Sequence, residues 1–188
     1  MPCRMPLLLA ATLLPWSVTA AKVLLPLAAI ALTLVLSRVR GLSPTQDFAL
    51  VRPPLRPLLW WLALTLGWLL LTDTLLPWRG AFDFAPWQAQ PLWISLARVL
   101  GVAVLGPIAE ELVVRGAIFS RLRAVGLPVG VVVAGTAAGW SLLHTEYTSV
   151  VIAIIFGFGL LLGLARHHTR SLWVPILMHI SWNLYAVW

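Results

Sequence analysis

Apolar runs separated by short polar segments make up most of the chain. Six of these runs are long enough to cross about 30 Å of hydrocarbon at a helical rise of about 1.5 Å per residue. They span residues 5–36, 58–76, 92–122, 128–145, 149–165 and 171–188. This pattern predicts an all-α, polytopic integral membrane helix bundle with about six or seven transmembrane helices, the number depending on the first run.

The first run is too long for one transmembrane helix and contains Lys22 near its middle. Residues 1–36 are therefore compatible with two short helices or with one tilted helix that extends beyond the bilayer. A third interpretation is a cleaved signal peptide, because Arg4 precedes the apolar stretch and the small residues of 17–21, SVTAA, resemble a cleavage site.

Composition supports an integral membrane protein and limits the kinds of partner that it can bind. Hydrophobic residues form 61% of the chain and charged residues 10%, against about a quarter charged in soluble domains. Thirteen basic residues oppose six acidic ones, and most basic residues lie between the apolar runs. This distribution indicates topology and contact with anionic lipid, and no nucleic-acid partner is expected. The single cysteine, Cys3, excludes an internal disulfide framework and a thiolate metal cluster.

Arginines are concentrated in alternate loops. The arginine-rich loops are 37–57, 120–127 and 166–170. The alternate loops, 77–91 and 145–148, contain only Arg79, opposed by Asp83 and Glu146. By the positive-inside rule, the arginine-rich loops face the cytoplasm. The arginine-rich, nearly lysine-free composition is typical of a high-GC bacterium, so we expect the bacterial inner (cytoplasmic) membrane.

Two further patterns concern helix packing and the membrane interface. Gly135 with Gly139 and Gly159 with Gly163 form small-xxx-small pairs, which let membrane helices approach closely. Several of the eleven tryptophans lie near the ends of runs, as in an interfacial aromatic belt. These are Trp60, Trp61, Trp78, Trp93, Trp173 and Trp188.

Polar side chains recur at helical spacing inside the C-terminal runs. The pairs are Glu111 with Arg115, Trp140 with His144, and His179 with Asn183. Residues four apart share a helix face, so each pair can point into a common interior. Titratable groups within membrane segments are costly and indicate function. Glu111 and Arg115 can also neutralise each other and hold two helices together.

Glu110 differs from its neighbour because Val114, four residues on, offers no opposite charge. An isolated carboxylate in a membrane cavity suits a general base. Pro107 is expected to interrupt the helix just before it and to free a backbone carbonyl near Ala103. Together with two imidazoles and an amide on other helices, such a base could hold a water molecule and stabilise an oxyanion.

Three motifs resemble those of a known family. They are EELVVR (110–115), WSLLH (140–144) and HISWN (179–183). In that order they resemble the CAAX-protease and bacteriocin-processing (CPBP, or Abi) family of glutamic-type intramembrane proteases. The resemblance covers 88–188, so we expect a catalytic membrane core there and N-terminal transmembrane helices with a cytoplasmic loop in 1–87.

The resemblance implies an endopeptidase without a metal cofactor. By analogy, Glu110 with His144 would activate the attacking water, and His179 with Asn183 would support the oxyanion. The residues that would shape and hold the site are Glu111, Arg115 and Trp140. Trp140 stands where the family commonly has phenylalanine, which keeps an aromatic wall and enlarges it.

Several functions remain open at this point. The substrate implied is a membrane-associated protein or peptide: a prenyl-type tail, a leader peptide, or a C-terminal sorting tail as in the myxosortase-like branch. Zinc held by two histidines and a glutamate is an alternative, although a His-Glu-x-x-His signature is missing. A non-catalytic immunity or scaffold protein that binds a partner through the same cavity is another.

Overall fold

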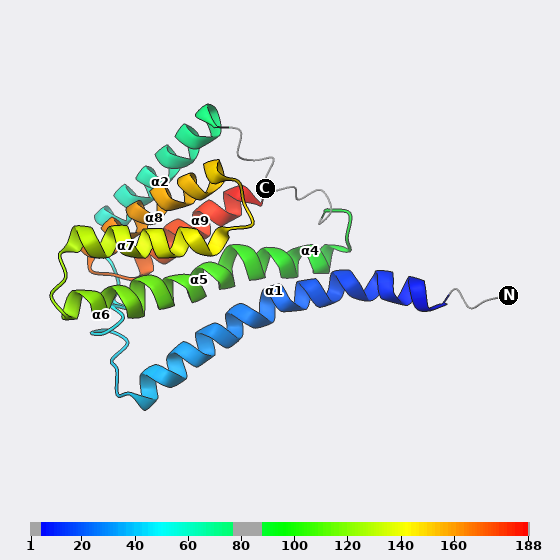
Figure 1. Cartoon of the computed structure of the whole chain (residues 1–188), viewed down its shortest axis with the longest axis horizontal. Coiled ribbons are helices and arrows are strands. Elements are labelled where there is room, and N and C mark those ends of the chain that lie inside the picture. Colours follow the sequence, from blue (N-terminus) through cyan, green and yellow to red (C-terminus); the bar gives the residue numbers. More distant parts are fainter. Residues whose placement is uncertain (1–4, 77–87, 188) are drawn as a thin grey trace.

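The computed structural model describes residues 5–76 and 88–187 and is all-α. Within these residues six helices follow one another along the chain (Figure 1). They are α1 (Met5–Val39), α2 (Leu55–Leu75), a composite helix of segments α4 to α6 (Leu92–Ala124), α7 (Val129–Ser141), α8 (Ser149–Thr169) and α9 (Trp173–Ala186). Cys3, Arg4, Trp78, Arg79, Asp83 and Trp188, which entered the predictions above, lie outside the described residues.

The first apolar run forms one continuous helix, α1, and not two short ones. An 18-residue window of its span Ser17–Val39 is only 6% buried, so most of the described surface of α1 faces away from the protein. An apolar helix with so little protein contact matches a helix that is solvated by lipid. Figure 1 shows α1 packed against the bundle along one side and extending beyond it.

The predicted six or seven transmembrane helices are too many. Four helices of the described chain are long and apolar enough to span a membrane: Ser17–Val39, Leu55–Leu75, Leu92–Ala124 and Ser149–Thr169. The two apolar runs at 128–145 and 171–188 form shorter helices. The 14 residues of α9 extend about 21 Å at 1.5 Å per residue, less than the ~30 Å hydrocarbon core. The architecture indicates an integral membrane protein.

The composite helix is continuous but not uniformly α-helical. α4 (Leu92–Val99) leads into a π-helical segment, η2 (Leu100–Leu105), then α5 (Gly106–Glu111), a second π-helical segment, η3 (Leu112–Ile118), and α6 (Phe119–Ala124). The prediction that Pro107 interrupts the helix is therefore wrong. The wider turn of η2 comes just before the proline, and in it the Gly106 N–H donates to the carbonyl of Gly101, five residues back. This wider winding lets the helix continue through Pro107.

Helices α7 and α8 are antiparallel neighbours that pack closely against each other. Gly159 on α8 lies against Ala137, where an added Cβ would come within 3.0 Å of the alanine Cβ. Gly163 meets Val133 in the same way, at 3.1 Å. The predicted close approach is therefore confirmed for the glycine pair on α8. It is wrong for Gly135 and Gly139, where an added Cβ would have no contact within 4 Å in the described structure.

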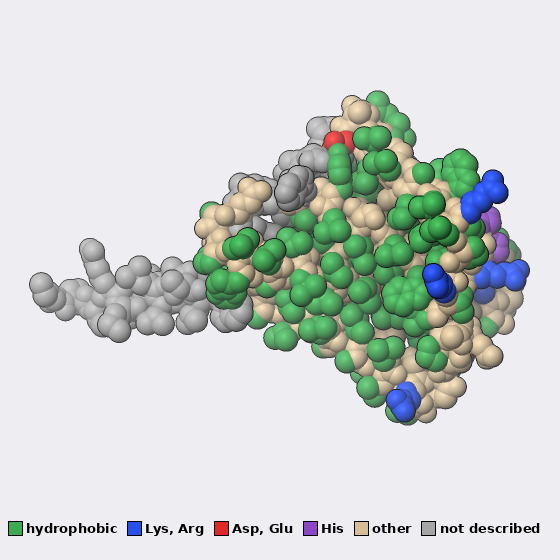
Figure 2. Space-filling view, turned by 180° about the vertical axis from the view of Figure 1, so that it is seen from behind, with side chains coloured by type: hydrophobic (Ala, Val, Ile, Leu, Met, Phe, Trp, Pro, Cys, Tyr) green, Lys and Arg blue, Asp and Glu red, His purple; other side chains and the backbone are tan. Residues whose placement is uncertain are grey.

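Basic side chains gather at one end of the bundle. α1 ends with Arg38, α6 with Arg121 and Arg123, and α8 with Arg166 and two histidines. These helix ends lie together on the left of Figure 1, and the view from behind in Figure 2 shows Lys, Arg and His side chains along the corresponding edge of a largely hydrophobic surface. We call this the basic end; it includes the loops that the positive-inside rule predicts to face the cytoplasm.

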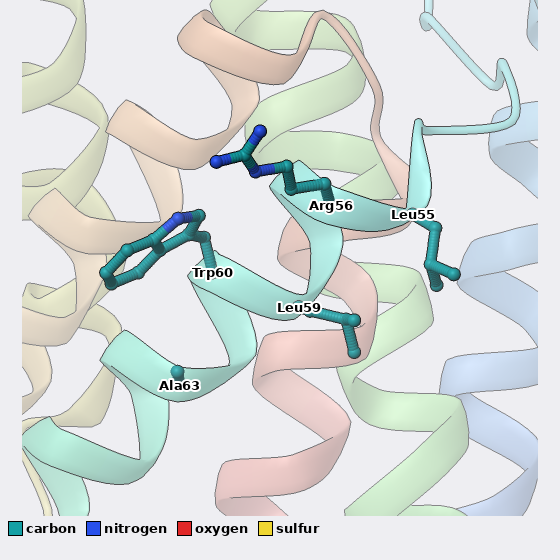
Figure 3. A pocket seen from close by; sticks show the side chains of 5 residues that line it. All are labelled: Leu55, Arg56, Leu59, Trp60 and Ala63. Atoms are coloured by element: carbon teal, nitrogen blue, oxygen red, sulfur yellow. The ribbon is translucent and has the colours of Figure 1, made fainter.

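The outer face of α2 has a shallow hollow near the basic end. Figure 3 shows its lining, which comes from α2 alone: Leu55, Arg56, Leu59, Trp60 and Ala63. The indole of Trp60 is 63% exposed and lies beside the Arg56 side chain. An exposed Trp beside an Arg is typical of an anchor at the membrane interface. None of the five residues that line this hollow has an acid, imidazole or amide side chain.

Candidate active site

A cavity of about 530 Å³ lies between α1, the composite helix, the end of α7 and α9. Its lining includes Glu110, His144, His179 and Asn183. The three sequence motifs are on different helices, yet their four proposed catalytic side chains border one hollow. This arrangement is the geometric condition that a shared reaction site requires.

One carboxylate oxygen of Glu110 accepts a hydrogen bond, and the other is free beside the cavity. Trp140 Nε1 donates to Glu110 Oε2 over 2.6 Å. Glu110 Oε1 has no hydrogen-bond partner among the described residues. Beside it lies Gly106, where an added Cβ would be 3.9 Å from Oε1. The missing side chain at Gly106 leaves room next to this oxygen for a small ligand such as water.

His144 terminates a single 3₁₀ turn, η4 (Leu142–His144), that follows α7. Its Nδ1 lies 3.0 Å from the carbonyl oxygen of Trp140. Because a carbonyl oxygen only accepts hydrogen bonds, Nδ1 must carry the proton in this contact. The neutral imidazole then has a basic Nε2, which is available for proton transfer.

His179 is buried and fixed by Glu111. Its Nδ1 lies 3.0 Å from Glu111 Oε1. The imidazole packs edge-on against the Trp140 indole, with ring centroids 5.1 Å apart. An ionised carboxylate accepts only, so it holds the proton on Nδ1 and orients the ring, leaving Nε2 as the free atom.

Glu111 and Arg115 form the predicted ion pair and are completely buried. Arg115 Nη1 donates to Glu111 Oε1 over 2.8 Å, and Nη2 donates to the carbonyl of Gly159 over 3.2 Å. The guanidinium also lies over the Trp140 ring, 4.7 Å from its centroid. Glu111 therefore links Arg115 to His179, so this pair braces a histidine of the site as well as neutralising itself.

Asn183 connects α9 to the π-helical segment η2. Its Nδ2 donates to the carbonyl of Val102 over 2.9 Å. In a π-helical turn each N–H bonds to the carbonyl five residues back, so a residue at position 107 would donate to Val102. Pro107 has no N–H, and the Val102 carbonyl is therefore free to accept from Asn183. The carbonyl expected near Ala103 is thus one residue earlier, because the helix is wound wider there. The amide nitrogen has a second hydrogen for another acceptor.

The sequence motifs did not identify the whole lining. α1 contributes Lys22, and the loop after η4 contributes Glu146 and Tyr147. A charged residue within an apolar run was the available signal for Lys22. The cavity is lined both by α1 and by the C-terminal helices, so it crosses the predicted division between residues 87 and 88. Nothing in the sequence indicated that α1 lies next to the C-terminal helices.

A metal site was the main chemical alternative. The described residues contain no group of three His, Cys, Asp or Glu side chains placed to hold a metal ion. The Trp140 indole contacts both His144 and His179, with ring centroids 5.3 and 5.1 Å away. The described residues therefore give the zinc alternative no support.

Comparison with protein-family models matches residues 91–185 to "Type II CAAX prenyl endopeptidase Rce1-like". Comparison with curated proteins and with solved structures gives no match. The matched segment is just over half of the 188 residues and contains Glu110, His144, His179 and Asn183. By this match the chain belongs to the Rce1-like family of type II CAAX prenyl endopeptidases.

Proposed function

We propose that the protein is an intramembrane endopeptidase that hydrolyses a peptide bond through a water activated by Glu110. Membership of a CAAX endopeptidase family suggests proteolysis and leaves the substrate open. The observation that supports the proposal most is the shared cavity, which four groups suited to acid–base and oxyanion chemistry line from three helices.

The proposed first step uses the free oxygen of Glu110. A water beside Oε1 loses a proton to the carboxylate as its oxygen bonds to the carbonyl carbon of the substrate. The Trp140 N–H fixes Oε2, so the carboxylate keeps one orientation. His144 Nε2 accepts a hydrogen bond from the second hydrogen of this water and holds the water in place, and the transferred proton stays on Glu110. When the C–N bond breaks, the proton passes to the departing amine.

The proposed oxyanion support comes from His179 and Asn183. When both of its nitrogens carry a proton, His179 donates to the oxyanion through Nε2 and to the Glu111 carboxylate through Nδ1. Asn183 donates through the Nδ2 hydrogen that Val102 does not use. Such preoriented donors are worth about 10²–10³ in rate each when they face a developing negative charge.

The substrate proposed is a membrane-associated protein: one with a prenyl-type tail, a leader peptide or a C-terminal sorting tail, in a bacterial inner membrane. The experiment compares membrane proteomes of cells that express the wild type, Glu110→Gln or no protein. A peptide or uncleaved precursor that accumulates equally in the last two identifies the substrate. Wild-type processing by a folded Glu110→Gln variant would instead favour the non-catalytic immunity or scaffold function.

A further inference from the structure

We propose that the catalytic cavity opens on the extracytoplasmic face of the membrane. The scissile bond would then lie in a juxtamembrane segment that its protein substrate exposes outside the cytoplasm. The identity of the cavity as a protease site rests on the proposed function, whereas the direction of its opening rests on geometry and charge alone.

The rim of the cavity lies at the end of the bundle opposite the basic end. Glu146 and Tyr147 lie in the loop that joins η4 to α8, and α8 then returns to the basic end. Val187 follows the last residue of α9, a helix that starts at the basic end. Figure 1 shows the end of α9 and the start of α8 on the right, away from the α6–α7 connection.

The lining of α1 lies at the same level. Lys22 borders the cavity, and about 26 Å of helix separates it from the end of α1 at Val39 at 1.5 Å per residue. That length is close to the ~30 Å of a hydrocarbon core, so the Lys22 ammonium lies near the interface on the far side. The part of the lining that α1 contributes is therefore closer to the far interface than to the basic end.

The basic end is closed beneath the site by packed side chains. Leu112, Leu172, Ile176 and Phe48 form a buried cluster there. The loop that contains Phe48 is tied to the start of α9, because Ser171 Oγ donates to the carbonyl of Val51 over 2.6 Å. Together with the buried Glu111–Arg115 pair, this cluster separates the cavity from the cytoplasmic surface.

Charge then fixes which face is which. The helix ends of the basic end contain Arg38, Arg121, Arg123 and Arg166, whereas the described loop at the opposite end, 145–148, contains Glu146 and no Lys or Arg. The positive-inside rule keeps such a basic end in the cytoplasm. The cavity rim therefore faces the other aqueous phase. Of the proposed substrates, a leader peptide or a C-terminal sorting tail that reaches this side can enter the cavity, whereas a prenyl-type tail attached in the cytoplasm cannot.

The test uses single-cysteine variants of the full chain in a Cys3→Ser background. Glu146→Cys marks the rim, Val125→Cys marks the exposed loop at the basic end, and Thr145→Cys is a second rim marker if Glu146→Cys fails to insert. A membrane-impermeant maleimide is added to right-side-out and to inverted membrane vesicles, and labelling is compared before and after detergent.

We expect Glu146→Cys to be labelled in right-side-out vesicles and Val125→Cys only after detergent, with the opposite result in inverted vesicles. Labelling of Val125→Cys from outside, or of both positions from the same side, overturns the proposal. Labelling does not depend on turnover, so an inactive protein with the expected pattern would contradict the protease function and leave the direction of opening intact.

Discussion

Asn183 donates a hydrogen bond to Val102 across 81 residues of sequence and occupies the acceptor that Pro107 leaves without a backbone donor. The bond joins α9 to the π-helical turn that precedes Glu110. The third sequence motif is therefore joined to the helix of the first motif by this bond to the backbone, and residues of both motifs also line the same cavity.

This bond predicts an energetic coupling between Pro107 and Asn183. Asn183→Leu should cost about 1 kcal/mol of unfolding free energy, because the Val102 carbonyl loses its donor. In Pro107→Ala/Asn183→Leu that cost should largely disappear, since an alanine N–H can donate to the same carbonyl. Unfolding in detergent of the two single variants and the double variant measures the coupling.

Ser181→Ala provides the control for this cycle, because the Ser181 hydroxyl bonds to Leu177 within α9 and does not contact Pro107. Additive effects are expected for Pro107→Ala with Ser181→Ala. If the changes in unfolding free energy of Pro107→Ala and Asn183→Leu also add, Asn183 does not replace the donor that the proline lacks.

Replacement of Glu111 should destabilise the protein much more than the same replacement of Glu110. Glu111→Gln leaves the completely buried guanidinium of Arg115 without its counter-charge, which should cost about 3–5 kcal/mol of stability. Glu110→Gln makes the same chemical change one residue earlier and should leave stability nearly unchanged, because Glu110 has no ion pair in the described structure. Thermal unfolding of both purified variants checks this; equal loss in the two would contradict the assignment.

Trp140→Phe should reduce kcat/KM by about tenfold to a hundredfold, the equivalent of about 1.5–3 kcal/mol for a lost hydrogen bond to a charged group. The phenylalanine ring retains an aromatic wall and removes the N–H that fixes Glu110 Oε2. Trp60→Phe, on the outer face of α2, is the matched control and should have wild-type activity. An unchanged kcat/KM in Trp140→Phe would mean that the 2.6 Å bond does not orient the base.

Gly106→Ala tests the space beside Glu110 Oε1. The new methyl would lie 3.9 Å from Oε1 and 3.3 Å from the Gly101 carbonyl oxygen, so it takes the room proposed for the attacking water. We expect turnover to fall while the protein stays folded. Gly135→Ala, in α7 with open space around it, should leave turnover unchanged. Similar rates in both variants would place the attacking water elsewhere.

The sequence predicted which polar side chains lie together better than it predicted the winding of the helix. Side chains with polar groups four residues apart in apolar runs led directly to Glu111 with Arg115, and to His144 and His179, because titratable groups in a membrane are costly and need polar partners. The sequence also located Pro107 but not the π-helical turn before it. In that turn the Val102 carbonyl accepts from Asn183, which is on a helix far along the chain, and short-range sequence patterns do not contain such a contact.

The number of membrane spans was overestimated for a related reason. Apolar content alone made 128–145 and 171–188 look like full spans, whereas the helices end earlier, at a 3₁₀ turn and at Ala186. Trp140 was predicted as a wall and also donates to Glu110, a role that only its orientation across the α5–α7 contact reveals. Lys22 was visible as a charge in an apolar run, but its neighbours were not.

The rate of peptide-bond hydrolysis by purified, reconstituted Glu110→Gln tests the central claim most directly, with Glu146→Gln, a second carboxylate lining the same cavity, as its control. Removal of the base should lower turnover by about 10²–10⁴ without loss of the fold, and Glu146→Gln should retain wild-type turnover. A folded Glu110→Gln protein that cleaves as fast as the wild type would contradict the account.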